Sequence, residues 1–194
     1  MKGQLPRDDR QAAFRLIARL LEYPDQSWRE AVPAFRAALG DLPAGKVAAG
    51  LACFLDEVAR WDPYALCDHY VQTFDFSQAT TLYLTYEQFG EQRERGQALL
   101  ALKQVYERAG FGLDDRELPD YLPVVLEFAS SAPAEEAEEL LATFRPVIER
   151  IHGGLCRLRS PYRHVFSALL SAIGPVSKEA GGNRRCPRGV RFSG

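Results

Sequence analysis

Hydrophobic positions recur at intervals of three and four residues along most of this 194-residue chain. This spacing places apolar side chains on one face of an α-helix, whereas the period-two alternation of a strand is missing. It predicts helices over residues 9–22, 27–39, 44–61, 64–74, 91–110, 120–128, 134–152 and 161–173. Asp62 and Asp120 are the expected N-caps of two of these helices, and Pro123 then falls within a first turn, where its missing N–H costs nothing.

The segment from Asp75 to Gly90 fits this pattern least well. Residues 81–86 have high β-propensity, but a lone strand would leave its backbone groups unpaired. We therefore expect a helix here too. The prediction is an all-α, single-domain bundle of about eight helices over residues 1–173. Residues 174–194 show no periodicity and are predicted to form a disordered tail.

The charge is distributed unevenly along the chain. It carries 24 basic and 26 acidic residues, a net charge of −2, and residues 181–194 contain four arginines and no acid. The remainder therefore holds 20 basic and 26 acidic residues, a net charge of −6, which argues against nucleic acid as a partner. No apolar run reaches the roughly 20 residues of a membrane span, and no secretory signal is recognisable. We expect a cytoplasmic protein without direct membrane insertion.

Cysteine and histidine are the candidates for metal or redox chemistry. The four cysteines form no CxxC pair, and we expect most of them to be small core residues. His152 and Cys156 are four residues apart and could share a helical face, but a zinc site needs three or four ligands. A small helical enzyme or metal-binding protein that uses this pair stays open as an alternative. No other arrangement in the sequence makes a convincing active site.

Aromatic residues gather between Tyr64 and Phe89, where seven occur in 26 residues. They either build the core or line a recognition surface. Phe74 and Phe76 cannot both face inward, because they flank Asp75. A wall of tyrosines with polar tips is typical of a groove for an amphipathic peptide. The predicted groove has apolar walls formed by Tyr70, Phe74, Leu82 and Tyr86. Its acidic rim is formed by Glu117 and Asp120. A scaffold that dimerises through this segment is a further possibility.

Several of these stretches resemble the NarJ family, within the TorD/DmsD-like helical group of redox-enzyme maturation chaperones. The resemblance covers about residues 14–170, and the matching stretches are Leu20–Asp25, Asp75-Phe76, Thr81–Leu84, Gly90–Gly96, Leu113–Pro123 and Glu127-Phe128. The wider group's Glu-x-Pro-Asp-His motif maps onto Glu117, Pro119, Asp120 and Tyr121, so that a tyrosine stands where histidine is common. Family members usually end in a longer acidic region, whereas this chain ends in a basic one.

The resemblance implies a cytoplasmic, all-helical, non-enzymatic chaperone for respiratory nitrate reductase. Such a protein binds the N-terminal leader of the catalytic (alpha) subunit and holds the apo-enzyme for molybdenum cofactor insertion before membrane docking. It carries no cofactor itself, since the molybdenum cofactor and iron–sulfur clusters belong to the client. Molybdenum cofactor biosynthesis proteins are further candidate partners. Asp75 and Tyr121 join the expected client-binding residues, and Arg93 and Arg95 either contact the client or form salt bridges on a helix surface.

Overall fold

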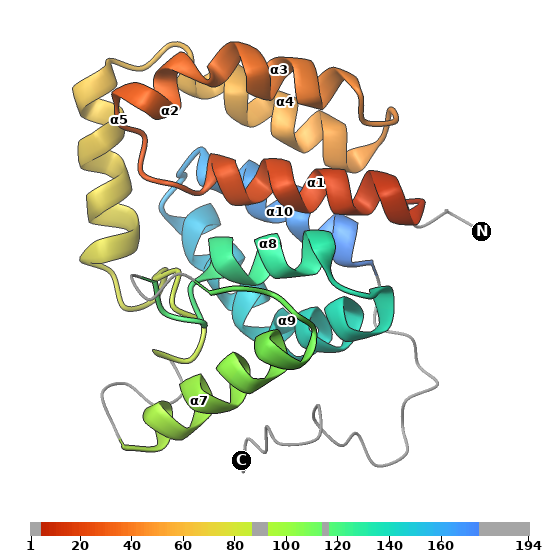
Figure 1. Cartoon of the computed structure of the whole chain (residues 1–194). Helices are drawn as coiled ribbons and strands as arrows, with labels where there is room; N and C mark the ends of the chain where they lie inside the picture. Colours follow the sequence, from red (N-terminus) through yellow and green to blue (C-terminus); the bar gives the residue numbers. More distant parts are fainter. Residues whose placement is uncertain (1–4, 87–92, 114–116, 175–194) are drawn as a thin grey trace.

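The protein is an assembly of α-helices connected by short loops (Figure 1). The structure, a computed structural model, describes residues 5–86, 93–113 and 117–174. Those residues contain nine α-helices, one π-helical turn and a single isolated β-bridge, which confirms the all-α class. The elements are α1 (Arg7–Leu20), α2 (Gln26–Glu30), α3 (Val32–Gly40), α4 (Lys46–Val58), α5 (Pro63–Tyr70), η1 (Val71–Asp75), α7 (Arg93–Arg108), α8 (Leu122–Ser131), α9 (Ala134–Arg157) and α10 (Tyr162–Ile173).

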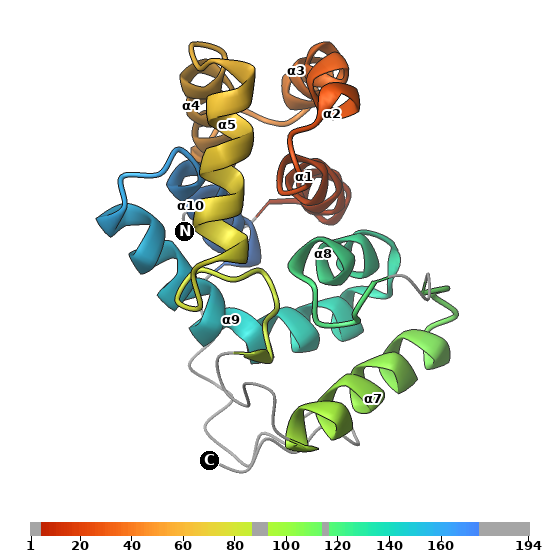
Figure 2. The ribbon, with the colours of Figure 1, turned by 90° about the vertical axis from the view of Figure 1, so that its left-hand side faces the viewer.

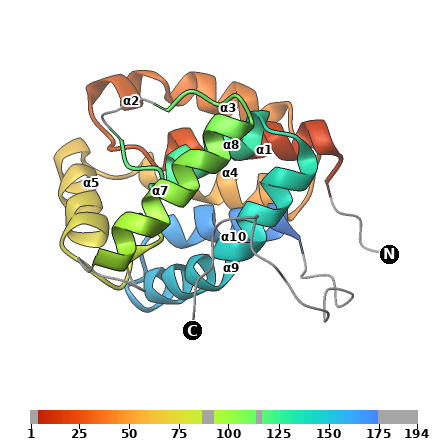
Figure 3. The same ribbon diagram turned by 60° about the horizontal axis from the view of Figure 1, so that its bottom comes forward.

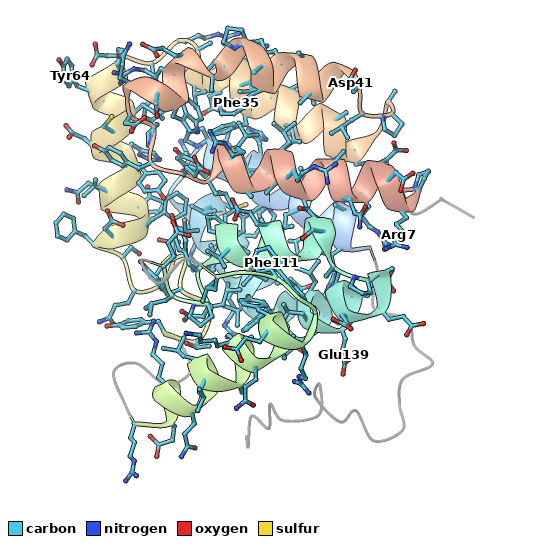
Figure 4. The ribbon with its side chains drawn as sticks, viewed as in Figure 1. Arg7, Phe35, Asp41, Tyr64, Phe111 and Glu139 are labelled. Carbon is cyan, nitrogen blue, oxygen red and sulfur yellow. The ribbon has the colours of Figure 1, made fainter. Side chains whose placement is uncertain are left out.

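The core forms around α10, which packs against α1, α4 and α9, while α1 packs against α8 (Figure 1). The apolar stripe of α10 is fully covered by these neighbours, as Val165, Phe166 and Leu169 show. Phe35 of α3 points into the interior, whereas Tyr64 at the start of α5 lies at the periphery (Figure 4). Burial of apolar surface on this scale is the main term that stabilises such a bundle.

α7 lies on the outer side of α8 (Figures 2 and 3). The ring of Tyr106 in α7 is 4.7 Å from the ring of Phe128 in α8. The expected helix over 91–110 is confirmed from Arg93 onward, and residues 91 and 92 are outside the described residues. Gly110, with φ of 73°, ends it in the left-handed conformation typical of a helix C-terminus.

The single helix expected over residues 27–39 is wrong, because the chain forms α2 and α3 instead. Pro33 has no backbone N–H to donate to the preceding turn, and it occupies the first turn of a new helix. Upstream, Asp25 caps α2 by accepting a hydrogen bond from the N–H of Trp28 at 2.9 Å. The break lets the ring of Trp28 pack on Phe35 and Phe54.

Asp62 is confirmed as an N-cap: its carboxylate accepts hydrogen bonds from the N–H groups of Tyr64 and Ala65. The helix that it starts, α5, ends earlier than expected and widens into η1. There the N–H of Phe76 donates to the carbonyl of Val71, five residues back, at 3.1 Å. A π-helical turn of this kind is often found at functional sites.

The helix expected over residues 75–90 is wrong in its described part, because residues 76–85 are largely irregular and residues 87–90 lie outside the described residues. Tyr83 forms an antiparallel bridge with Tyr121. The N–H of Leu84 donates to the carbonyl of Asp120 at 3.0 Å, and the N–H of Leu122 donates to the carbonyl of Leu82 at 2.9 Å. The loop before α8 therefore supplies the partner that a lone strand would lack.

Asp120 does not cap α8, and this prediction is wrong. Tyr121 occupies the N-cap position without a side-chain hydrogen bond, because the Asp120 carboxylate faces residues of other segments. Pro123 lies in the first turn of α8, as predicted. α9 continues through Gly153 and Gly154 to Arg157, five residues beyond the expected end.

Two of the cysteines expected in the core are on the surface. Cys53 and Cys156 are exposed, and Cys67 is half-buried with its thiol donating to the carbonyl of Pro24 at 3.2 Å. Cys186 and the tail predicted to be disordered, apart from Gly174, lie outside the described residues. In the part of the chain that the structure describes, no helix combines the length and hydrophobicity needed to cross a membrane.

Candidate functional site

A pocket of about 240 Å³ lies where α5, η1, the 76–86 segment and the loop before α8 meet. Aromatic side chains dominate its lining, which consists of Tyr23, Tyr70, Phe74, Asp75, Leu82, Tyr83 and Tyr121. Tyr23 and Tyr83 are 46% and 37% exposed, so part of this wall is open to solvent. Tyr70, Phe74 and Leu82 are buried and form its inner part. Such a site offers a partner apolar surface together with hydroxyl groups.

η1 orients the side chains at one side of the pocket. Phe74 is 3% exposed and packs edge-on against Tyr70, with ring centroids 4.9 Å apart. Phe76 is 75% exposed, which confirms that the two phenylalanines face opposite ways. Asp75, between them, is exposed and still contributes to the pocket lining. Desolvation raises the pKa of its carboxyl group.

Two tyrosine hydroxyls meet inside the pocket wall. The hydroxyl of Tyr70 donates to the carbonyl of Leu21 at 2.8 Å and lies 3.2 Å from the hydroxyl of Tyr121. Because the Tyr70 proton is directed to Leu21, Tyr121 donates to Tyr70. Burial raises the pKa of Tyr121 to about 12 and raises the pKa of Tyr70 as well, so both phenols stay protonated at neutral pH. The hydroxyls thereby fix the rings in place.

A buried ion pair holds the outer wall of the pocket. Asp120 is fully buried, and its Oδ2 accepts hydrogen bonds from the N–H and hydroxyl of Thr85, at 3.1 and 2.6 Å, and from Arg95 Nη2 at 3.3 Å. Arg95 Nε also donates to the Thr85 hydroxyl at 3.2 Å. This network joins α7 to the crossing of residues 82–85 with residues 120–122, and it positions Tyr83 and Tyr121.

The guanidinium of Arg95 also lies against two tyrosine rings. Its central carbon is 5.8 Å from the ring centroid of Tyr83 and 5.4 Å from that of Tyr86. These distances are typical of cation–π contacts. Arg95 thus supports the pocket from behind, and its charge is already committed to Asp120.

Carboxylates surround the pocket at a greater distance. Burial raises the pKa of Glu22 and of Glu127, and repulsion from Glu117 raises both further. The charge of Glu117 also acts on the hydroxyls of Tyr83 and Tyr121, and the charge of Asp75 acts on Tyr83. Arg19 neutralises part of this charge through a salt bridge of 3.2 Å to Glu22. The region around the tyrosines is therefore acidic.

The structure brings together most of the residues that the sequence pointed to. Tyr70, Phe74, Asp75, Leu82 and Tyr121 all line the pocket. Glu117 is exposed and close enough to act on two of its tyrosines.

Other predicted site residues have different surroundings. Asp120 is an internal anchor and not part of a rim, because Thr85 and Arg95 surround its carboxylate. Pro119 is buried, and its carbonyl accepts a hydrogen bond from the hydroxyl of Tyr106 at 2.7 Å. Tyr86 packs on Arg95 and does not line the pocket. Arg93 is exposed at the start of α7.

Four residues of the site were not singled out from the sequence: Tyr23, Tyr83, Glu22 and Glu127. Tyr23 follows α1 and reaches the ring of Tyr70 at 5.5 Å, a contact between residues 47 positions apart. Tyr83 belongs to the aromatic cluster of the sequence. Its place at the pocket depends on the bridge to Tyr121, which the sequence does not reveal. The two glutamates come together only through the packing of α1 against α8.

His152 and Cys156 do share one face of α9, with Nε2 and Sγ 3.5 Å apart. Burial lowers the pKa of His152. Among the described residues, no group of three or more His, Cys, Asp or Glu side chains is placed to hold a metal ion. The pair itself supplies two ligands, fewer than a zinc site needs.

Comparison with known proteins places the chain in a family. A family model described as nitrate reductase delta subunit matches residues 21–167. The chain is 39% identical over 165 residues to the Bacillus subtilis (strain 168) protein named "Probable nitrate reductase molybdenum cofactor assembly chaperone NarJ", and the match covers 85% of this chain and 90% of that protein.

Two proteins of Escherichia coli (strain K12) are also similar. The nitrate reductase molybdenum cofactor assembly chaperone NarJ is 37% identical over 80% of this chain and 66% of its own length. The protein named "Probable nitrate reductase molybdenum cofactor assembly chaperone NarW" is 35% identical over 83% of this chain and 68% of its own length.

The chain therefore belongs to the nitrate reductase delta subunit family. The three relatives described above are named as assembly chaperones and not as catalytic enzymes, which supports a chaperone role and a non-enzymatic protein. The resemblance to the NarJ family noted from the sequence is confirmed.

Proposed function

We propose that this protein is a system-specific chaperone that binds the N-terminal leader of the nitrate reductase alpha subunit. It holds the apo-enzyme in the cytoplasm for molybdenum cofactor insertion and assembly, and it delays docking to the membrane. The client supplies the molybdenum cofactor and the iron–sulfur clusters, and the chaperone binds polypeptide only. Molybdenum cofactor biosynthesis proteins belong to this proposal as further partners.

The observation that supports the proposal is the tyrosine pocket and its acidic surroundings. Tyr23 and Tyr83 present partly exposed rings, and Leu82 and Phe74 provide an apolar interior. An apolar side chain from an amphipathic leader helix gains free energy when it leaves water for this pocket. Asp75 in the lining and Glu117 nearby favour a leader that carries basic residues beside that side chain.

Calorimetric titration of a leader peptide tests this proposal. Tyr23→Ala and Tyr83→Ala each remove an aromatic wall, and we expect either change to weaken leader binding by about 5- to 30-fold, as truncation of an aromatic hot-spot residue commonly does. Tyr64→Ala is the matched control, because Tyr64 is 80% exposed and outside the pocket.

The control variant should bind the leader like the unchanged protein. Circular dichroism and thermal unfolding of all three variants establish that the fold is intact. The pocket assignment is wrong if both pocket variants keep full affinity while they remain folded. The leader proposal itself is wrong if the unchanged chain does not bind the peptide in competition with an unrelated amphipathic helix.

A further inference from the structure

The sequence of this chain contains a segment with the charge that the tyrosine pocket favours. Residues 181–194 carry Arg184, Arg185, Arg188 and Arg191 and no acid, against a net charge of −6 for the rest of the chain. The same segment contains Val190 and Phe192, two apolar residues that flank Arg191. Basic and apolar residues in alternation are the chemistry that an aromatic pocket among carboxylates recognises.

We propose that this basic segment, residues 181–194, binds the tyrosine pocket of its own chain and competes there with the client. The competition rests on the proposed function, because it assumes that the leader binds the same pocket. Leader binding would then require displacement of the segment, so that only a peptide with sufficient affinity gains access.

The position of the pocket relative to the end of α10 makes this geometry feasible. The ring of Tyr162, the first residue of α10, lies 4.9 Å from Phe74 and 5.8 Å from Tyr70. Gly174 directly follows the last residue of α10. α10 has twelve residues that rise by about 1.5 Å each, so its start beside the pocket and its end before Gly174 are about 18 Å apart.

The chain after Gly174 is long enough for this span. The fifteen residues between Gly174 and Val190, residues 175–189, can reach about 50 Å when fully extended. A flexible chain of that length has a root-mean-square span of about 21 Å, close to one length of α10 plus a side chain. A tether whose span matches the distance between its sites gives an effective concentration of about 1 mM. Even a weak contact between the segment and the pocket would therefore be substantially occupied.

The charges around the pocket favour this occupant. Asp75 lines the pocket, and Glu22, Glu117 and Glu127 raise one another's pKa or act on its tyrosines. The guanidinium of Arg95 is engaged with Asp120, inside the wall, so it does not offset these carboxylates at the opening. Arg19 pairs with Glu22 and offsets one of them. A segment with four arginines can contact the others.

The test uses the full chain with all four arginines changed, R184Q/R185Q/R188Q/R191Q. We expect this variant to bind the leader peptide about 10-fold more tightly than the unchanged chain, if the isolated segment has a dissociation constant of about 100 μM against an effective concentration of about 1 mM. The matched control replaces the same arginines by lysine, which retains the charge, and its leader affinity should stay within about 2-fold of that of the unchanged chain.

A synthetic peptide of residues 181–194 provides the direct measurement. Added to the glutamine variant, a fluorescent form of this peptide should bind with an anisotropy change that Tyr23→Ala in the same background abolishes. Equal leader affinity of the glutamine variant and the unchanged chain, with no binding of the peptide, overturns the inference and leaves the proposed function standing. Peptide binding without leader binding to any variant instead rejects the leader proposal while the docking of the segment stands.

Discussion

α10 contacts the pocket residues Tyr70 and Phe74 through Tyr162, and residues 82–86 supply Leu82 and Tyr83 to the pocket lining, yet the two segments are held in different ways. α10 buries Val165, Phe166 and Leu169 among the neighbouring helices, and each of these contacts is apolar and replaceable by another of similar volume. Residues 82–86 are held by two backbone hydrogen bonds across the bridge and by the carboxylate of Asp120. The bundle therefore depends on many small contributions, whereas the pocket wall depends on a few polar contacts.

This difference teaches where the molecule is sensitive. A buried carboxylate that loses its partners is far more costly than a surface ion pair that does so, because water cannot replace the missing contacts. The tyrosines of the pocket wall do not follow helical periodicity. The lining side chains come from four separate segments of the chain and face the same pocket. Substitutions at Asp120, Gly154 and Glu127 test this contrast.

Asp120→Ala removes the acceptor for Thr85 and leaves the Arg95 charge largely buried without its partner. We expect the free energy of unfolding to fall by about 3–5 kcal/mol, as when one partner of a buried ion pair is removed. Urea denaturation followed by circular dichroism measures it. Asp56→Ala, which breaks the exposed pair of 2.9 Å with Arg36, is the control and should cost about 1 kcal/mol or less. Equal losses for the two variants would contradict the distinction between buried and exposed pairs.

Gly154→Ala tests how closely the loop before Thr81 rests on α9. A Cβ at this position would lie 2.7 Å from Cγ2 of Thr80, whose hydroxyl donates to the carbonyl of Thr73. We expect a loss of about 1–3 kcal/mol in the free energy of unfolding, despite the better helix propensity of alanine. Thr80→Ser in the same chain removes that methyl group, keeps the hydroxyl and should restore most of the loss.

Gly153→Ala is the control for this change. It lies next to Gly154 on the same helix, but its nearest neighbour is the flexible end of Arg157 at 3.6 Å. Alanine there should stabilise the protein by about 0.5–1 kcal/mol through helix propensity alone. Thermal unfolding distinguishes the two substitutions by the sign of the change in Tm.

Glu127→Gln is expected to have the smallest effect, and its sign depends on pH. Burial and repulsion from Glu117 raise the pKa of Glu127 in the folded protein above its unfolded value. A raised carboxyl pKa means that the folded state holds the proton more tightly, so the associated stability is present at low pH and is lost as pH rises through the raised pKa. Glutamine removes this loss.

Glu127→Gln should therefore raise Tm at pH 7, by less than about 4 °C for a partly solvated carboxylate, and should give no gain below about pH 4. Scanning calorimetry at both pH values measures this. Glu139→Gln, on the exposed surface of α9 (Figure 4), is the control and should shift Tm by a similar small amount at both pH values. A gain that is as large at pH 4 as at pH 7 would show that the carboxylate charge is not the cause.

The helical class, most helix positions and the stretches that resemble the NarJ family can be predicted from the sequence, because these depend on periodicity and on residues adjacent in the chain. Asp62 illustrates this: a cap acts on N–H groups two and three residues away. The spacing of Phe74 and Phe76 likewise predicted that they do not both face inward, and the structure agrees, with Phe74 buried and Phe76 exposed.

Three features follow from the packing of distant segments alone: the pairing of Tyr83 with Tyr121, the burial of Asp120 and the approach of Tyr23 to Tyr70. Each of these depends on residues at least 25 positions apart, so no local pattern contains it. Asp120 had the residue type and position of a helix cap, but in the folded chain its carboxylate accepts two hydrogen bonds from Thr85 and one from Arg95 of α7 instead. Whether Asp120 caps a helix or makes long-range contacts depends on which donors the folded chain places beside its carboxylate. The packing of the segments determines this.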